Sequence, residues 1–202
     1  MSNYRRVVKL DLPEPLCQKI RDNIQHSNIK QSAFYRSQNS SHNIVSRLIM
    51  RWFFKEGYFQ VYRLDETLEK EILEFYKPFT DSVGHAPKIR LKITHDVRQL
   101  MPHSDAADGG DRSSIVTVIA GNGETTSWYN RGDDCHSSWW DLLTMRKVDS
   151  ISFDTDCAYL FNNAQVHGVT KCKPNSTRYL LAVSWQNVDY TKLSKAYDHY
   201  SN

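Results

Sequence analysis

The first part of the chain places its apolar residues at a helical spacing. From Leu16 to Gln25 they recur every four positions on one face, which predicts an amphipathic helix. The same pattern predicts a helix from Asp65 to Phe75, with Asp65 as its N-cap and Pro78 just past its end. A further helix is predicted from Ile44 to Phe54, and the Ser-, Asn- and Gln-rich stretch from Gln31 to His42 is predicted to be a loop.

From Pro87 onwards the period of the pattern changes to two. The segment Lys88–Thr94 alternates basic and apolar residues, as a half-buried strand does. The basic face of this strand is open to two interpretations: a solvated face, which we favour, or a surface for an anionic partner. Further strands are predicted at Ser113–Ala120, Thr125–Tyr129, Ser150–Phe153, Cys157–Phe161, Gly168–Cys172 and Arg178–Asn187, with a tight turn at Gly121–Gly123.

Short strands that follow a group of helices predict a mainly β fold with some α, as a sandwich or jelly roll backed by N-terminal helices. We expect one domain over 1–202, with a mainly helical part at about 1–86 and a jelly-roll core at about 87–190. The last strand supports this arrangement. Its large residues, such as Trp185, alternate with smaller ones, such as Ala182, so we expect the large residues to face covering helices and the smaller ones a ligand.

Composition narrows the class of protein. Of the 202 residues, 40% are hydrophobic and 24% charged, as in ordinary globular proteins, and a net charge of +3 is too small to argue for nucleic acid. We expect no membrane span, because no apolar run is long enough, and no secretory signal, because the N-terminus lacks an apolar stretch. The four cysteines form no CxxC pair, so we expect reduced thiols in a cytoplasmic protein, although a disulfide stays open.

The candidate chemistry begins at His103-Ser104-Asp105. Residues two apart on an extended segment point to the same side, so this imidazole and carboxylate can bind one metal. His167, at the start of a later strand, completes a set of two histidines and one carboxylate, which suits iron(II) and leaves coordination positions open. Arg178 opens the last strand, and its guanidinium can grip the far carboxylate of a dianionic keto acid that chelates the metal.

This ordered pattern of HxD, His and Arg resembles the iron(II)/2-oxoglutarate-dependent oxygenases. It is carried by HSD at His103–Asp105, VHGV around His167 and RYLLAVSW from Arg178, and DLPEPLCQKI is similar to the entry helix of the prolyl-hydroxylase-like branch. The resemblance implies a double-stranded β-helix that uses Fe(II), 2-oxoglutarate and O₂. It also implies a dioxygenase reaction, usually hydroxylation, with succinate and CO₂ as coproducts. Asp105 favours hydroxylation over halogenation, because the related halogenases have Ala or Gly there.

Four further residues are candidates for binding. The segment Gly123–Tyr129 resembles a strand of prolyl-hydroxylase-like members, so Thr126 and Trp128 are predicted to line the cosubstrate pocket, as is Asn163. Arg112 is predicted to clamp an acidic group of the substrate.

Three functions stay open at this stage. The first is hydroxylation of a small molecule such as an amino acid, which the modest length of the chain favours. The second is hydroxylation of a protein or peptide side chain by the same chemistry. The third is a non-redox, cupin-like jelly roll that binds a metal or ligand, although such a protein has no need of the clamp at Arg178. Nucleic acid is disfavoured as a substrate, because Ser184 stands where the nucleic-acid demethylases have a second arginine.

Overall fold

The computed structural model describes residues 4–9, 11–26, 33–34, 59–62, 64–95, 100–106, 110–121, 125–130, 144–155, 157–171 and 177–201. The predicted helix Ile44–Phe54 lies outside the described residues, as do most of the loop Gln31–His42 and the second and third residues of the turn Gly121–Gly123.

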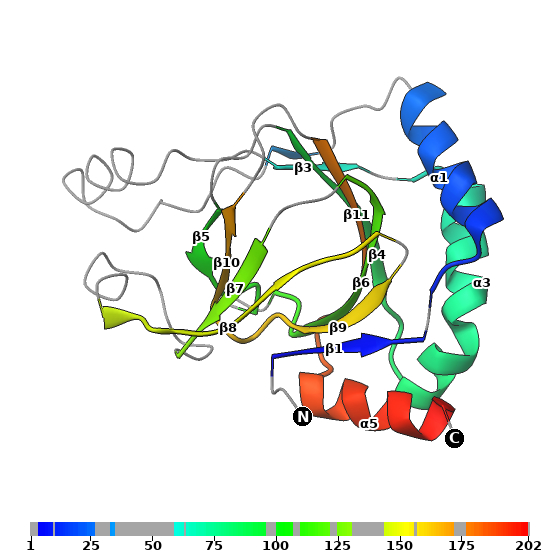
Figure 1. Cartoon of the computed structure of the whole chain (residues 1–202). Coiled ribbons are helices and arrows are strands. Elements are labelled where there is room, and N and C mark those ends of the chain that lie inside the picture. Colours follow the sequence, from blue (N-terminus) through cyan, green and yellow to red (C-terminus); the bar gives the residue numbers. More distant parts are fainter. Residues whose placement is uncertain are drawn as a thin grey trace.

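The described part of the chain contains helices near both ends and strands between them (Figure 1). The helices are α1 (Glu14–His26), α3 (Glu66–Val83) and α5 (Tyr190–Ser201). The strands are β1 (Arg5–Val8), β2 (Ala33–Phe34), β3 (Phe59–Tyr62), β4 (Lys88–His95), β5 (Leu100–His103), β6 (Ser113–Ala120), β7 (Thr125–Tyr129), β8 (Lys147–Ser152), β9 (Ala158–Asn162), β10 (His167–Lys171) and β11 (Thr177–Trp185). The predicted strands Ser113–Ala120 and Thr125–Tyr129 match β6 and β7, and the other predicted strands overlap β4 and β8 to β11.

The strands form two antiparallel sheets. One sheet has seven strands in the order β1-β9-β6-β11-β4-β3-β2, and the other has four in the order β5-β10-β7-β8. Figure 1 shows the two sheets curving around a common interior. Antiparallel sheets with few helices are consistent with the predicted jelly-roll-like fold.

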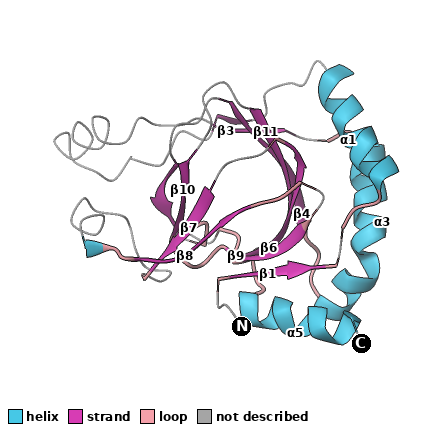
Figure 2. Cartoon of the chain, in the orientation of Figure 1, coloured by secondary structure: helices cyan, strands magenta, loops and turns pink. Residues whose placement is uncertain are grey.

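The helices cover the outer face of the seven-stranded sheet (Figure 2). On β11, Leu181, Val183 and Trp185 are almost fully buried and pack into the same core as the apolar faces of α1, α3 and α5. Trp185 is also held by its indole N–H, which donates to the carbonyl of His85 at 2.8 Å. The prediction that the large residues of the last strand lie under helices is therefore confirmed.

The interior between the sheets has a separate, more aromatic core. It is made by Val116, Val118, Trp128, Phe153, Tyr159, Phe161 and Ala182. The rings of Trp128, on β7, and Phe161, on β9, have centroids 5.0 Å apart, so this contact joins the two sheets. Ala182 lies on the inner face of β11, as its small size predicted.

Helix α3 begins as predicted but runs further. The carboxylate of Asp65 accepts a hydrogen bond from the backbone N–H of Leu68 at 2.9 Å, which caps the first turn. The predicted end before Pro78 is wrong, because the helix continues to Val83 and stops at Gly84, whose φ is 76°. Phe79 and Val83 are buried beyond the proline, and their burial offsets the cost of about 3 kcal/mol for a proline inside a helix.

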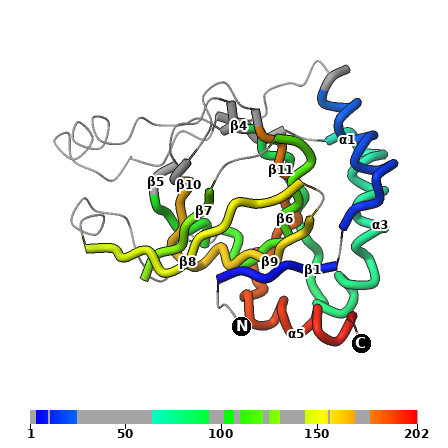
Figure 3. The backbone as a smooth tube through the Cα atoms, viewed as in Figure 1, coloured from blue at the N-terminus to red at the C-terminus, as the bar shows by residue number. Residues whose placement is uncertain are grey.

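Two regions differ from the predicted division into an N-terminal helical part and a C-terminal strand part. Strands β1, β2 and β3 come from the part predicted to be mainly helical, and α5 follows the last strand. Figure 3 shows β1 running beside β9, and Arg5 of β1 reaches Asp149 of β8, with Nε 3.2 Å from Oδ2. This ion pair ties an edge strand of one sheet to an edge strand of the other.

Among the described residues, no helix has the length and apolar character that a membrane crossing requires.

Candidate functional site

The structure brings His103, Asp105 and His167 together on the four-stranded sheet. His103 ends β5 and His167 begins β10, and the two are direct cross-strand partners. Their Nε2 atoms lie 3.2 Å and 4.0 Å from the two carboxylate oxygens of Asp105. One ligand atom from each residue can be chosen so that all three lie within 4.8 Å of one another, so the group could hold a metal ion.

Hydrogen bonds hold the Asp105 segment against the loop before β10. The backbone N–H of Asp105 donates to the carbonyl of Asn163 at 3.0 Å. The buried hydroxyl of Ser104 lies 3.1 Å from the carbonyl of Ala164 and accepts from the N–H of Ala106 at 3.3 Å. These bonds position the backbone that carries the Asp105 carboxylate before any metal binds.

His167 is fixed by a bond to the backbone. Its Nδ1 lies 2.9 Å from the carbonyl of Gln165, and a carbonyl can only accept, so Nδ1 carries the proton. The other ring nitrogen, Nε2, is then the basic one, and it faces Asp105. A histidine that ligates a metal commonly has such a partner on its second nitrogen.

The protonation states also suit a metal. Burial is the main cause that lowers the pKa of His167 from 6.5 to about 4, with a smaller electrostatic contribution from His103, so the imidazole of His167 is neutral at pH 7. Burial raises the pKa of Asp105, but the nearby Lys92, His103 and His167 outweigh it and hold that pKa well below its usual value. A neutral imidazole and an ionised carboxylate are the forms that bind a divalent cation.

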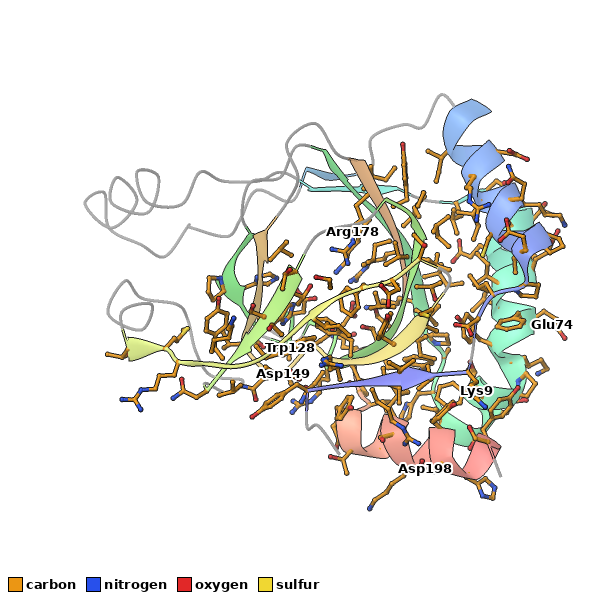
Figure 4. The ribbon with its side chains drawn as sticks, in the orientation of Figure 1. Lys9, Glu74, Trp128, Asp149, Arg178 and Asp198 are labelled. Carbon is orange, nitrogen blue, oxygen red and sulfur yellow. The ribbon has the colours of Figure 1, made fainter. Side chains whose placement is uncertain are left out.

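Arg178 lies inside the molecule, near the start of β11. Only 7% of its surface is exposed, and its guanidinium carbon is 5.3 Å from the centroid of the Phe153 ring. It shares a strand face with Ala182, which belongs to the interior core, and with Leu180, which packs against that core. Figure 4 shows its side chain in the space between the two sheets, where a buried cation favours an anionic ligand.

Trp128 is the direct cross-strand partner of His167 on the other side of β10. Its side chain is fully buried, and its indole Nε1–H has no hydrogen-bond partner among the described residues. A buried donor left unpaired costs about 1–3 kcal/mol, so such a group calls for an explanation such as a ligand. Thr126, two residues earlier on β7, is buried and shares this strand face.

The other two predicted binding residues lie differently. Asn163 is buried, and its side-chain oxygen accepts from the hydroxyl of Ser114 at 3.2 Å, while its main chain supports the Asp105 segment. Arg112 has an exposed side chain, and its carbonyl accepts from the N–H of Asn163 at 3.1 Å. Both residues thus brace the loop that holds Asp105.

Lys92 is the site residue that the sequence analysis did not identify. Its Nζ lies 3.5 Å from Oδ2 of Asp105, and about a quarter of its side chain is exposed. The favoured interpretation of the basic face of β4 as solvated is correct for the exposed Lys88 but wrong for Lys92. The alternation along β4 separates the two faces but does not say which one meets water; in the structure Ile89, Leu91 and Ile93 pack under the helices, which turns Lys92 towards the interior.

Comparisons with known proteins give the fold. No model of a known protein family matches the sequence, and no curated protein matches it. Among solved structures, a prolyl hydroxylase from Trichoplax adhaerens, in complex with a hypoxia inducible factor peptide fragment, is similar at a TM-score of 0.56 and 13% identity. That match covers 96% of this chain and 87% of the hydroxylase.

Two further structures give the same result. The non-heme alpha ketoglutarate dependent carbocyclase SnoK, from nogalamycin biosynthesis, matches at a TM-score of 0.52 and 9% identity over 89% of this chain and 78% of its own. AviO1 from Streptomyces viridochromogenes Tue57 matches at a TM-score of 0.52 and 12% identity, over 92% of this chain and 91% of AviO1. At these identities the likeness is one of fold: the chain shares its fold with the prolyl hydroxylase and with the alpha ketoglutarate dependent carbocyclase.

Proposed function

We propose that the protein is a non-haem iron(II)- and 2-oxoglutarate-dependent oxygenase, built on a single double-stranded β-helix domain. It hydroxylates an aliphatic C–H bond of a small molecule such as an amino acid and releases succinate and CO₂. The observation that carries this proposal is the joint placement of two kinds of group. His103, Asp105 and His167 converge at one end of β5 and β10, and the buried Arg178 faces the same interior from β11.

The residues present fit iron(II). Two imidazoles and one carboxylate are the ligand set that iron(II) oxygenases use, and the tautomer of His167 leaves Nε2 as the ligating atom. When bound, the iron would supply the activation of dioxygen and the oxidation of the substrate. The protein's own part is to hold the three ligands in place and to keep His167 neutral and Asp105 charged before the metal arrives.

Two residues would position 2-oxoglutarate. Arg178 would bind the far carboxylate through two parallel hydrogen bonds, and Phe153 beneath the guanidinium restricts the planes in which it can lie. Trp128 would donate its indole N–H, which has no acceptor among the described residues, to a cosubstrate oxygen, and this would remove the cost of a buried donor without an acceptor. Thr126 and Asn163 are weaker candidates for binding the cosubstrate. In the case of Asn163, the side-chain oxygen already accepts a hydrogen bond from Ser114.

Two alternatives remain. In one, the same chemistry acts on a protein or peptide side chain, and the solved prolyl hydroxylase in complex with a peptide fragment supports this possibility. In the other, the jelly roll binds a metal or ligand without redox chemistry. The second alternative gives no role to the buried Arg178 beside the interior core, whereas the first function provides its guanidinium with a carboxylate to bind.

The test is succinate formation. Purified protein with Fe(II), 2-oxoglutarate and O₂ is incubated with panels of amino acids and small acids and, separately, with peptide libraries. We expect succinate and a product heavier by one oxygen from the small-molecule panel, and neither from the His167→Ala variant. Turnover of peptides alone would favour the second function, and no succinate from either panel would favour the non-redox alternative.

A further inference from the structure

The loop between β9 and β10 contacts two of the three proposed metal ligands through its own carbonyls. The carbonyl of Gln165 accepts from Nδ1 of His167 at 2.9 Å. The carbonyl of Asn163 accepts from the backbone N–H of Asp105 at 3.0 Å. These two carbonyls belong to one short segment, so the conformation of that segment sets the positions of His167 and Asp105 together.

The side chain of Asn162 shapes this segment. Its Oδ1 accepts hydrogen bonds from the backbone N–H groups of Ala164 at 3.1 Å and Gln165 at 3.3 Å. An asparagine that binds the N–H groups just ahead of it in this way forms an Asx turn. Asn162 is the last residue of β9, so the turn begins where the strand ends. The directions of the Asn163 and Gln165 carbonyls are therefore set by this turn.

The turn is anchored on the seven-stranded sheet. The backbone N–H of Asn162 donates to the carbonyl of Tyr4 at 3.0 Å, beside the start of β1. The N–H groups of Asn163 and Ala164 both donate to the carbonyl of Arg112, at 3.1 Å and 3.2 Å. The loop thus has its supports on one sheet and directs its carbonyls to ligands at the end of the other.

The position of the Gln165 carbonyl decides which nitrogen of His167 carries the proton. Oδ2 of Asp105 lies 4.0 Å from Nε2 and can also accept a hydrogen bond. If the Gln165 carbonyl moved away from Nδ1, the carboxylate would become the better acceptor, and the proton would transfer to Nε2. A neutral imidazole that is protonated on Nε2 has no lone pair there for a metal. The carbonyl therefore keeps Nε2 available as a ligand.

We propose that Asn162 is a positioning residue of the metal site. Its side chain holds the turn in which Gln165 presents the ligating tautomer of His167 and Asn163 holds the backbone of Asp105. This role rests on the proposed function, since that function supplies the metal. It also makes a separate statement about the metal-free protein, because the turn selects the tautomer before any ion binds. A turn that served the fold alone would change stability without changing the tautomer.

The first measurement is nitrogen-15 NMR of the imidazole rings in metal-free protein at pH 7, with the His167 signals assigned by their loss in His167→Asn. The wild type should show the proton on Nδ1. Asn162→Ala should shift the population towards the form with the proton on Nε2. The second measurement is Mn(II) affinity by electron paramagnetic resonance, which should fall by about tenfold in Asn162→Ala, as expected when a group that orients a ligand is lost.

Two further variants separate the place of the acceptor from its polarity. Asn162→Gln keeps the amide but moves its oxygen one methylene outwards, so the turn should no longer close, and the variant should behave as Asn162→Ala does. Asn162→Asp keeps an acceptor oxygen in the same place and should retain the wild-type tautomer and at least the wild-type manganese affinity. If Asn162→Ala does not fold, the Gln and Asp variants make the same comparison.

Asp189 offers a matched control. Its Oδ1 accepts from the backbone N–H of Lys192 at 2.8 Å at the start of α5, so Asp189→Ala removes the same kind of bond from a turn that carries none of the ligands. Urea unfolding should show lower stability in both Asn162→Ala and Asp189→Ala, whereas the tautomer and the manganese affinity should change in Asn162→Ala alone. Lys70→Gln, at an exposed position of α3, should leave all three measurements unchanged.

Several results would overturn this role of Asn162. An unchanged tautomer and manganese affinity in Asn162→Ala would make the turn a feature of the fold only. An equal loss of manganese affinity in Asp189→Ala would attribute the effect to general destabilisation. A loss in Asn162→Asp as large as in Asn162→Ala would show that the acceptor oxygen is not what matters. If the wild type does not bind manganese but Asn162→Ala still shifts the tautomer, the proposed function fails while the positioning of His167 stands.

Discussion

Replacement of Ser104 by alanine should weaken metal binding while it leaves the fold nearly intact. The hydroxyl of Ser104 is buried and joins the Asp105 segment to the carbonyls of Asn163 and Ala164 at 3.3 Å and 3.1 Å. It also accepts from the N–H of Ala106 at 3.3 Å. Without the hydroxyl, Asp105 is held to this loop through its own backbone N–H, which still donates to Asn163. The carboxylate should then sample more orientations, most of them unsuitable for the metal.

The expected magnitudes differ for folding and for metal binding. Loss of the neutral hydrogen bonds of the Ser104 hydroxyl should lower the free energy of unfolding by about 0.5–1.5 kcal/mol for each bond that is lost. Loss of a contact that orients a ligand should lower metal affinity by on the order of tenfold. Ser113 offers a matched control, because its buried hydroxyl also donates to a backbone carbonyl, that of Val188 at 2.5 Å, which is not part of the segments that carry the three ligands. Ser113→Ala should cost similar stability and leave metal affinity unchanged.

The assay is Mn(II) binding followed by electron paramagnetic resonance, with urea unfolding of the metal-free proteins measured alongside. The reasoning predicts that the two variants unfold at similar urea concentrations but that Ser104→Ala alone binds manganese more weakly. Equal manganese affinity in Ser104→Ala and the wild type would refute the idea that this hydroxyl positions Asp105. An equal loss in both variants would attribute the effect to general destabilisation.

Three further predictions concern other parts of the molecule. Arg178→Ala should weaken 2-oxoglutarate binding to the Mn(II) protein by on the order of ten- to a hundredfold, because charge-assisted bonds are worth about 1.5–3 kcal/mol; calorimetry that shows no change would exclude the clamp. The metal-free protein should lose stability as the pH falls from 6.5 to about 4, because the unfolded chain takes up a proton that buried His167 resists. The loss should reach at most about 3 kcal/mol in urea unfolding and should largely disappear in His167→Asn. Leu193→Ala, at a fully buried position of α5, should cost about 2–5 kcal/mol in the same assay, whereas Lys192→Ala, at an exposed position beside it, should cost little.

The sequence predicted the strands better than the arrangement of charge on them. Alternation along β11 separated Trp185 and Leu181 from Ala182, and the size of these residues indicated which face lies under helices. Alternation along β4 separated the two faces equally well, but a basic face by itself does not say whether it meets water or an interior that binds anions. Only the pairing of β4 with β11 decided this, and pairing between strands distant in sequence is not encoded in the local pattern.

Helices were missed or shortened where tertiary packing overrides a local signal. Pro78 indicated a helix end, yet α3 continues because Phe79 and Val83 are buried beyond it. Helix α5 had a readable pattern, with Tyr190, Leu193 and Tyr197 on one face, but it is short and mostly polar. At the site, the spacing of His103 and Asp105 predicted two neighbours, whereas the approach of His167 needed the register of β10 against β5.

The most direct test of the central claim is anaerobic absorption spectroscopy of the metal-free protein during addition of Fe(II) and then 2-oxoglutarate. A keto acid chelated to iron gives a weak visible charge-transfer band, and its appearance needs no knowledge of the substrate. We predict that the band appears in the wild type and is absent from His167→Ala, while Lys70→Gln behaves as the wild type. Iron binding without a band would contradict the assignment of 2-oxoglutarate as cosubstrate and favour a metal-binding jelly roll without redox chemistry.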